Sequence, residues 1–167
     1  MNALADLLIL YKAIEFGDFT LASGAKSRYY VDVKTAVTHP EFLAAIAQEI
    51  VKRYDFDVVA GVAVGGVPLA VATSLAAQKP FAIIRAEEKD HGKKSLIIGD
   101  VKGKNILLVE DVTTSGGSAL YGITTLREAG ARADRVVTVV DREQGAEATL
   151  KKLAIDLCPL VRVSELL

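Results

Sequence analysis

Residues 105–117 read Asn-Ile-Leu-Leu-Val-Glu-Asp-Val-Thr-Thr-Ser-Gly-Gly, and they are the most informative part of the chain. Its aliphatic part, residues 106–109, is typical of a strand that is buried on both faces in a parallel sheet. Two carboxylates, Glu110 and Asp111, follow this run, and a loop of hydroxyl side chains and glycines comes next. An apolar pattern with helical spacing begins near Ser118. The stretch therefore predicts a strand, a polar loop and the N-terminus of a helix.

The polar loop has the composition of a binding site for a phosphate monoester. Free backbone N–H groups and the positive end of a helix attract a phosphate, and glycines let the backbone approach it closely. The two carboxylates would repel that phosphate, but they would accept hydrogen bonds from a vicinal diol nearby. A ribose 5-phosphate carries both groups. The alternative is an ordinary strand-to-helix turn with acids that cap the helix, which leaves the second acid unexplained.

The composition indicates one globular domain. The chain has 167 residues, 51% of them hydrophobic, and a formal net charge of −1. These values argue against a protein that charge holds on nucleic acid or on a membrane surface. Cys158 is the only cysteine, so there is no disulfide framework, and its aliphatic surroundings suggest a core residue. A signal-peptide pattern and a stretch of membrane-spanning length are both absent from the sequence, so we expect a cytoplasmic protein.

Residues 1–36 predict a small unit that packs on the core. Apolar residues at helical spacing predict a helix over residues 2–16 that ends at Gly17. Two extended segments, residues 19–21 and 29–33, flank a Ser-Gly turn and predict a hairpin or a pair of edge strands. Three cations in this region are interpreted as charges on a solvated edge, namely Lys26, Arg28 and Lys34.

Residues 37–167 predict an α/β core in which strands and helices alternate. Thr38-x-x-Glu41 has the capping-box pattern and predicts the start of a helix. Strands are expected at residues 58–62, 81–84, 96–98, 106–109, 136–140 and 155–158, and helices at residues 38–54, 69–75, 118–129 and 146–152. Gly65 and Gly66, after the first of these strands, fit either a second anion site or a close helix–sheet contact.

Residues 85–95 are almost entirely polar and lie between two predicted strands. They include Arg85, Lys89 and His91. One interpretation is a solvated surface loop, which is the usual explanation of a charge run. The other is a mobile lid that brings cations to a polyanionic substrate and excludes water. The predicted sugar-phosphate site downstream favours the lid.

Arg142 follows a predicted strand, at the sheet edge where ligands of open α/β proteins bind. Its planar fork of donors suits a carboxylate or an imide edge of a substrate. The alternative is a surface contact with Asp141 or Glu143, which would contribute little.

The central stretch resembles the phosphoribosyl-diphosphate (PRPP) signature of type I phosphoribosyltransferases: an aliphatic strand, two acids, a variable residue, then threonine, serine and glycine. Residues 16–145 are similar to the orotate phosphoribosyltransferase family, in the compact form found in archaea. Residues 16–30 look like the N-terminal hood of that family, and residues 85–92 resemble its catalytic loop. Asp141-Arg142 is similar to its orotate-contacting end.

The resemblance implies an α/β fold of the type I phosphoribosyltransferase class: one domain with a central, mostly parallel sheet flanked by helices and a small N-terminal hood. It implies transfer of ribose 5-phosphate from PRPP to N1 of orotate, giving orotidine 5′-monophosphate and pyrophosphate. Mg²⁺ is the expected cofactor, held mainly by substrate and water and not by protein ligands. The expected assembly is a homodimer in which residues 85–95 act at the neighbouring subunit's site, without a nucleic-acid or membrane partner.

The same resemblance assigns roles to individual residues. The expected catalytic residues are Lys89, His91, Glu110 and Asp111. The expected PRPP-binding residues are Arg85, Lys89, His91, Glu110, Asp111, Val112, Thr113, Thr114, Ser115, Gly116, Gly117 and Ser118. Orotate is expected to contact Thr114, Arg142 and the backbone near Tyr30 and Val31.

Three positions depart from this family pattern. Many bacterial relatives carry lysine where this chain has Ala22, Gly65 and Ala86, so three cations near the phosphates are missing. The candidates to replace them are Lys26, Lys93 and Lys94.

Two other functions stay open at this point. One is a non-catalytic, PRPP-sensing regulator on the same fold, although the sequence shows no helix-turn-helix extension or basic stripe. The other is transfer to uracil or a purine, against which Arg142 and the hood pattern argue.

Overall fold

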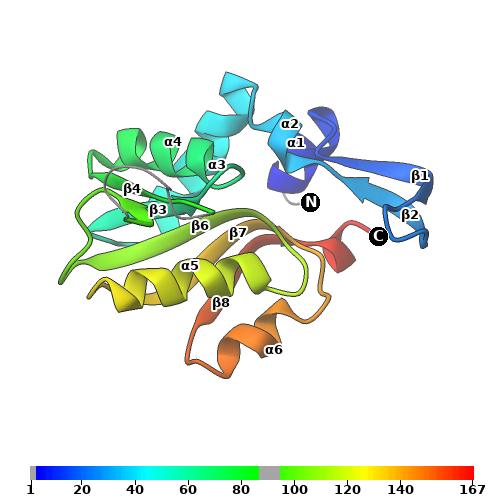
Figure 1. Ribbon diagram of the computed structural model, residues 1–167. Helices are drawn as coiled ribbons and strands as arrows, with labels where there is room; N and C mark the ends of the chain where they lie inside the picture. The colour runs from blue at the N-terminus through cyan, green and yellow to red at the C-terminus, as the bar shows by residue number, and fades with distance from the viewer. Residues whose placement is uncertain (1–2, 87–94) are drawn as a thin grey trace.

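A six-stranded sheet forms the centre of the computed structural model, which describes residues 3–86 and 95–167 (Figure 1). Its strands are β3 (Val58–Val62), β4 (Phe81–Ile84), β5 (Ile97–Ile98), β6 (Asn105–Thr113), β7 (Arg132–Asp141) and β8 (Asp156–Arg162), in the spatial order β5-β4-β3-β6-β7-β8. β5 is antiparallel to β4 and all other neighbours are parallel, which confirms the mostly parallel sheet. The carboxyl ends of β3, β4, β6 and β7 therefore meet at one edge.

Helices cover both faces of the sheet (Figure 1). α3 (Pro40–Arg53) and α4 (Val67–Ala77) lie over one face, and α5 (Gly117–Glu128) and α6 (Ala146–Lys151) over the other. Since side chains alternate along a strand, β6 contributes Leu107 and Val109 to one core and Ile106 and Leu108 to the other. This burial on both faces explains the unbroken aliphatic run. No helix in the described part of the chain is long and apolar enough to cross a membrane.

The N-terminal unit consists of α1 (Ala3–Leu10), a hairpin of β1 (Ile14–Thr20) and β2 (Lys26–Val31), and the short helix α2 (Val33–Ala36). The predicted hairpin is confirmed, but the predicted helix over residues 2–16 is too long. The chain turns at Lys12, where φ is +56°, and Ile14 pairs with Val31. The apolar spacing fits a helix, but pairing and burial of Ala13 and Ile14 at the base of the hairpin override it.

The hairpin projects from the body beside the C-terminus (Figure 1). After β8 the chain forms the 3₁₀ helix η1 (Val163–Glu165), and Val163 joins the same core cluster as Leu4 and Leu8 of α1. The base of the hairpin is therefore anchored to the core from both ends of the chain.

Two local predictions differ from the structure. β6 continues to Thr113, past the predicted end at residue 109, because its last residues pair with β7. The predicted capping box of α3 is wrong. The N-cap residue is His39, whose side chain makes no capping hydrogen bond, and the Thr38 hydroxyl instead donates to the Thr35 carbonyl oxygen at 2.6 Å.

Candidate functional site

Glu110 and Asp111 lie at the carboxyl end of β6, and both are buried, with exposed fractions of 4% and 6%. As neighbours in a strand, they point to opposite faces of the sheet. Glu110 accepts a hydrogen bond from the Ser118 hydroxyl of α5 at 3.3 Å. Asp111 instead contacts the Lys34 ammonium of α2 at 3.0 Å. A ligand that uses both carboxylates must therefore span the end of β6.

Burial, and after it the negative charge of Asp111, raise the pKa of Glu110 to about 7. The Ser118 hydrogen bond and the Lys34 charge lower it in part. Glu110 is therefore a carboxyl group that changes its charge near neutral pH. It accepts hydrogen bonds from hydroxyl groups when ionised, and it gains a donor when protonated.

The loop between β6 and α5 surrounds a small cavity of about 100 Å³, lined by Glu110 and residues 112–119. Gly116 is the N-cap residue of α5 and has a φ of +91°. A Cβ at this position would lie 3.1 Å from Ala146 Cα, so both the backbone angle and the space require glycine. Gly117 and Ser118 begin α5, so N–H groups without a helical partner border this cavity. Such a cavity can bind a phosphate group.

Thr113 connects this loop to the end of β7. Its hydroxyl donates to Asp141 Oδ1 at 3.0 Å, and its carbonyl oxygen accepts the Arg142 N–H at 2.9 Å. The basic partner of Asp141 is Arg162, at 3.7 Å, and no ion pair joins Arg142 to Asp141 or Glu143 in the described residues. The alternative reading of Arg142 as a partner of these acids is therefore not supported.

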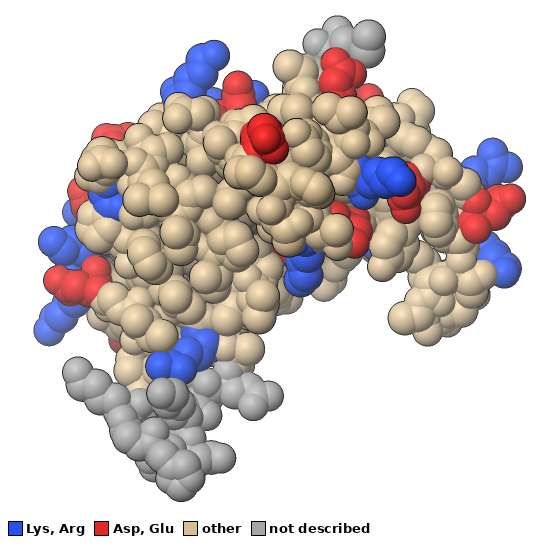
Figure 2. Space-filling model, turned by 90° about the horizontal axis from the view of Figure 1, so that it is seen from above, with Lys and Arg blue, Asp and Glu red and all other residues tan. Residues whose placement is uncertain are grey.

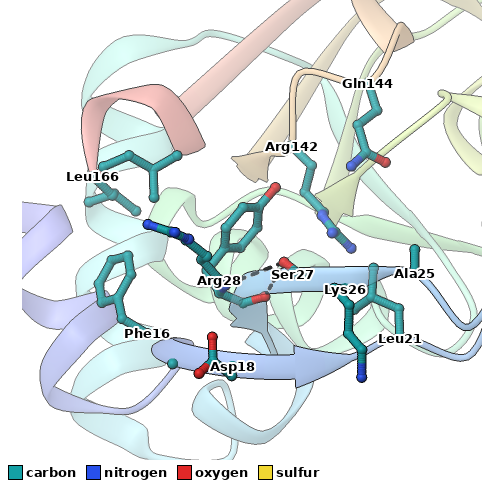
Figure 3. A pocket seen from close by; sticks show the side chains of 13 residues that line it. Phe16, Asp18, Leu21, Ala25, Lys26, Ser27, Arg28, Arg142, Gln144 and Leu166 are labelled. Atoms are coloured by element: carbon teal, nitrogen blue, oxygen red, sulfur yellow. Dashed lines mark hydrogen bonds between the residues drawn. The ribbon is translucent and has the colours of Figure 1, made fainter.

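A larger cavity, of about 1020 Å³, lies between the hairpin and the end of β7 (Figure 3). Arg142 and Gln144 point toward it from the β7 side, and Phe16 and Arg28 line it from the hairpin side. The Arg142 guanidinium lies over the Tyr29 ring, 5.4 Å from its centroid. Arg142 Nε is buried and has no hydrogen-bond partner among the described residues. An arginine with an aromatic support and an unpaired donor suits a planar, anionic ligand.

Tyr30 and Val31 complete β2 beside this cavity. Because Tyr29 faces Arg142, the alternation of the strand turns the Tyr30 side chain to the other side. There its ring packs on Phe19, with 5.7 Å between the ring centroids. This placement is compatible with a contact from the Tyr30 backbone, but it directs the Tyr30 ring away from Arg142.

Arg85 follows β4 at the same sheet edge. Its N–H donates to the Leu96 carbonyl oxygen at 2.7 Å, and its carbonyl oxygen accepts the Tyr121 hydroxyl at 2.6 Å. Arg85 Nε is buried and has no hydrogen-bond partner in the described part of the chain. The other cations predicted for this segment lie outside the described residues, namely Lys89, His91, Lys93 and Lys94.

Lys34 is a site residue that sequence reasoning missed. Its side chain is largely exposed, as expected for a charge on a solvated edge, but its ammonium lies 3.0 Å from Asp111 Oδ2, so that interpretation is incomplete. The hydrogen bond to Asp111 and the charge of that carboxylate raise the pKa of Lys34. No spacing signal connects residue 34 with residue 111, because the contact arises from the packing of α2 against β6. Lys26, a candidate cation, instead donates to the Thr20 hydroxyl at 2.7 Å and points away from Arg142 (Figure 3).

The surface charges show no single sign on the face drawn in Figure 2. Acidic and basic side chains are interspersed on the face shown in Figure 2, and a notch separates the lobe of the hairpin from the body. Within residues 3–86 and 95–167, no three His, Cys, Asp or Glu side chains come together as a metal site.

The chain matches known proteins over nearly its full length. Residues 32–156 match the model of the phosphoribosyl transferase domain family. The orotate phosphoribosyltransferase of Methanocorpusculum labreanum is 66% identical over 167 residues, which cover 100% of this chain and 99% of the relative.

Solved structures give the same picture. A crystal structure of the Mycobacterium tuberculosis orotate phosphoribosyltransferase in complex with Fe(III) dicitrate matches with a TM-score of 0.83 and 32% identity, covering 98% of each chain. Another structure of that enzyme, in complex with 5-phospho-α-D-ribosyl 1-diphosphate, matches with a TM-score of 0.76 and 27% identity. That match covers 98% of this chain and 90% of the other. The likeness thus includes the hairpin as well as the α/β core.

Proposed function

The chain belongs to the phosphoribosyltransferase family and, within it, to the orotate phosphoribosyltransferases, and we propose that it transfers the ribose 5-phosphate of PRPP to N1 of orotate. The products are orotidine 5′-monophosphate and pyrophosphate. The observation that carries this proposal is a buried acid pair beside a cavity of about 100 Å³ at a helix N-terminus. These two parts fit the diol and the 5-phosphate of one sugar phosphate.

The end of β6 and the loop after it would hold PRPP. The N–H and hydroxyl groups of residues 112–118 donate hydrogen bonds to the 5-phosphate. Glu110 and Asp111 accept hydrogen bonds from the ribose hydroxyls. As the bond from C1 to the diphosphate breaks and the bond to N1 of orotate forms, positive charge develops on the ribose ring. The two buried carboxylates stabilise that charge, which is a contribution made mainly in the transition state.

The site also fits the expected Mg²⁺. Glu110 and Asp111 offer the carboxylate oxygens that this ion prefers, and both carboxylates are buried side by side in sequence at the end of β6. When bound beside Glu110 and Asp111, the ion would supply positive charge that favours departure of the pyrophosphate. We propose that substrate and water supply most of its ligands.

Orotate would bind in the cavity of about 1020 Å³ that Arg142 lines. Arg142 directly follows β7, the neighbour of β6, so a ligand held by its guanidinium lies one strand away from the ribose site. The unpaired Arg142 Nε suits the carboxylate or an imide oxygen of orotate. We propose that Thr114 and the backbone near Tyr30 and Val31 complete this subsite.

For the departing pyrophosphate we propose Arg85, Lys89 and His91 as the neutralising cations. The support for Arg85 is its place at the shared sheet edge and its unpaired, buried Nε. The support for Lys89 and His91 is the family resemblance of residues 85–92. We also propose a homodimer in which these residues act at the neighbouring subunit's site.

A panel of bases tests the proposed function. The purified protein is mixed with PRPP, Mg²⁺ and either orotate, uracil, adenine or hypoxanthine, and formation of nucleotide and pyrophosphate is followed. We expect turnover with orotate alone. Turnover with another base would reassign the base subsite, and PRPP binding without turnover on any base would favour a PRPP-sensing regulator.

A further inference from the structure

Lys34 has a solvated stem, but its tip lies on a buried acid. Its side chain is 66% exposed, whereas that of Asp111 is 8% exposed. The position of Lys34 is fixed because Asp32 caps α2 with its side chain and because Val33 and Ala36 are buried. A single ion pair of an exposed lysine contributes little to stability, so the fold alone does not explain this contact.

Lys34 lies on the side of β6 that is opposite to the phosphate-binding loop. Glu110 and Ser118 meet on the α5 side of the strand, and Asp111 and Lys34 meet on the α2 side. A ribose that spans the end of β6 with its 5-phosphate in the loop directs its other end toward Asp111. That end, C1, carries the diphosphate. The Lys34 ammonium is therefore beside the part of PRPP that bears the most negative charge.

Gly65, in the loop after β3, leaves the space around Asp111 open to Lys34. A Cβ at position 65 would lie 2.6 Å from Asp111 Oδ2, which is the oxygen that the Lys34 ammonium contacts at 3.0 Å. The two positions thus converge on one carboxylate oxygen, and a side chain at position 65 would have to displace it. In this chain the cation beside Asp111 is the Lys34 ammonium of α2, and Gly65 in the loop after β3 contributes no side chain there.

We propose that Lys34 binds the diphosphate of PRPP, an inference that rests on the proposed function. In the free protein the ammonium neutralises Asp111. When PRPP binds, the ribose hydroxyls donate hydrogen bonds to Asp111 in place of Lys34. The ammonium has three donors and turns one or more of them to the diphosphate oxygens. Lys34 thus exchanges one anionic partner for another as the site fills.

Two substitutions separate this role from simple positioning of Asp111. Lys34→Gln keeps a donor for Asp111 but removes the charge, and Lys34→Arg keeps the charge. Binding of a diphosphate depends on the charge, so arginine should replace lysine and glutamine should not. If Lys34 only held Asp111 in place, glutamine would serve as well. Lys52, exposed in the last turn of α3, provides a control lysine in Lys52→Ala.

The experiment is titration calorimetry of the full-length protein with Mg²⁺ and three probes: PRPP, pyrophosphate and ribose 5-phosphate. We expect Lys34→Gln to weaken the binding of PRPP and of pyrophosphate by about 10- to 100-fold and to change that of ribose 5-phosphate less than about threefold. Lys34→Arg should recover most of this loss, and Lys52→Ala should bind all three probes like the wild type.

Unchanged pyrophosphate binding in Lys34→Gln would overturn the proposal, and so would an equal loss of ribose 5-phosphate binding. Because these titrations need no turnover, they are independent of the base panel. A wild-type protein that binds PRPP but forms no orotidine 5′-monophosphate would refute the proposed function, and the titrations would still decide whether Lys34 meets the diphosphate.

Discussion

Glu110 is the residue in which burial and chemistry are most closely linked. Burial and the neighbouring Asp111 raise its pKa from 4.5 to about 7 in the folded protein. In the folded state the carboxyl therefore keeps its proton over a pH range in which the unfolded chain has lost it. The resulting stabilisation is fully present below the unfolded pKa and is lost as the pH rises through the folded pKa.

We predict that the free energy of unfolding falls as the pH rises from about 4.5 to 7, by up to about 3 kcal/mol from Glu110 alone. Urea denaturation at a series of pH values measures this fall. Glu110→Gln, which cannot ionise, should remove it. If the variant and the wild type show the same pH dependence, other groups are responsible and the assignment to Glu110 is wrong.

Arg142→Ala should raise the KM for orotate by about 30- to 100-fold, because the lost guanidinium would have made charge-assisted hydrogen bonds to the planar anion. The KM for PRPP should change little. Steady-state kinetics with each substrate varied in turn measures both values. Arg132→Ala is the matched control, because Arg132 is exposed at the opposite end of the same strand. A selective rise in the KM for PRPP would show that Arg142 contacts PRPP and not orotate.

The turn from β6 into α5 places the phosphate-binding groups. β6 runs to Thr113 because it pairs with β7 as far as Asp141, and the Thr113 hydroxyl donates to that aspartate. The chain then turns through Gly116, which packs against Ala146 at the start of α6. The loop is therefore held by its neighbours on both sides, and the N–H groups of α5 are positioned before a ligand arrives.

Gly116→Ala should destabilise the protein by about 1–3 kcal/mol and weaken PRPP binding, because alanine at a φ of +91° is strained and its Cβ would crowd Ala146. Urea denaturation and calorimetry measure the two effects. The control is Gly103→Ala, at a φ of +72° with no atom within 4 Å of the added Cβ. It shares the backbone strain but lacks the close contact. Equal losses in both variants would show that Ala146 plays no part.

At the level of the whole molecule, the proposed homodimer places Lys89 and Asp111 of one active site on different subunits. Lys89→Ala and Asp111→Asn should each be nearly inactive, but a random mixture should regain about a quarter of the wild-type activity, since half of the dimers are hybrids with one intact site. Turnover after mixing and refolding the two variants measures this recovery. If the mixture is no more active than either variant alone, Lys89 and Asp111 of one active site belong to the same subunit.

The parts of the fold that the sequence predicts are those set by local patterns. β3 and β4 were expected at residues 58–62 and 81–84 and are found there, since each is a short aliphatic run. The loop of residues 112–118 was expected around one phosphate, and the structure places it around one cavity. The end of α1, the end of β6 and the contact of Lys34 were missed. Each depends on a partner far along the chain, which a local pattern does not contain.

The opposite directions of Glu110 and Asp111 depend on how many residues precede them in β6. Side chains alternate with a period of two, so one inserted or deleted residue within 106–109 would exchange the two acids between the faces. The carboxylate of Glu110 would then face α2 and that of Asp111 would face α5, so neither Ser118 nor Lys34 would keep its present partner, although every residue type would still be present. A second such change would restore the directions. Ligand binding at this strand therefore depends on whether the number of residues before the acids is odd or even. Insertion or deletion of a single residue there should weaken ligand binding far more than substitutions of similar volume.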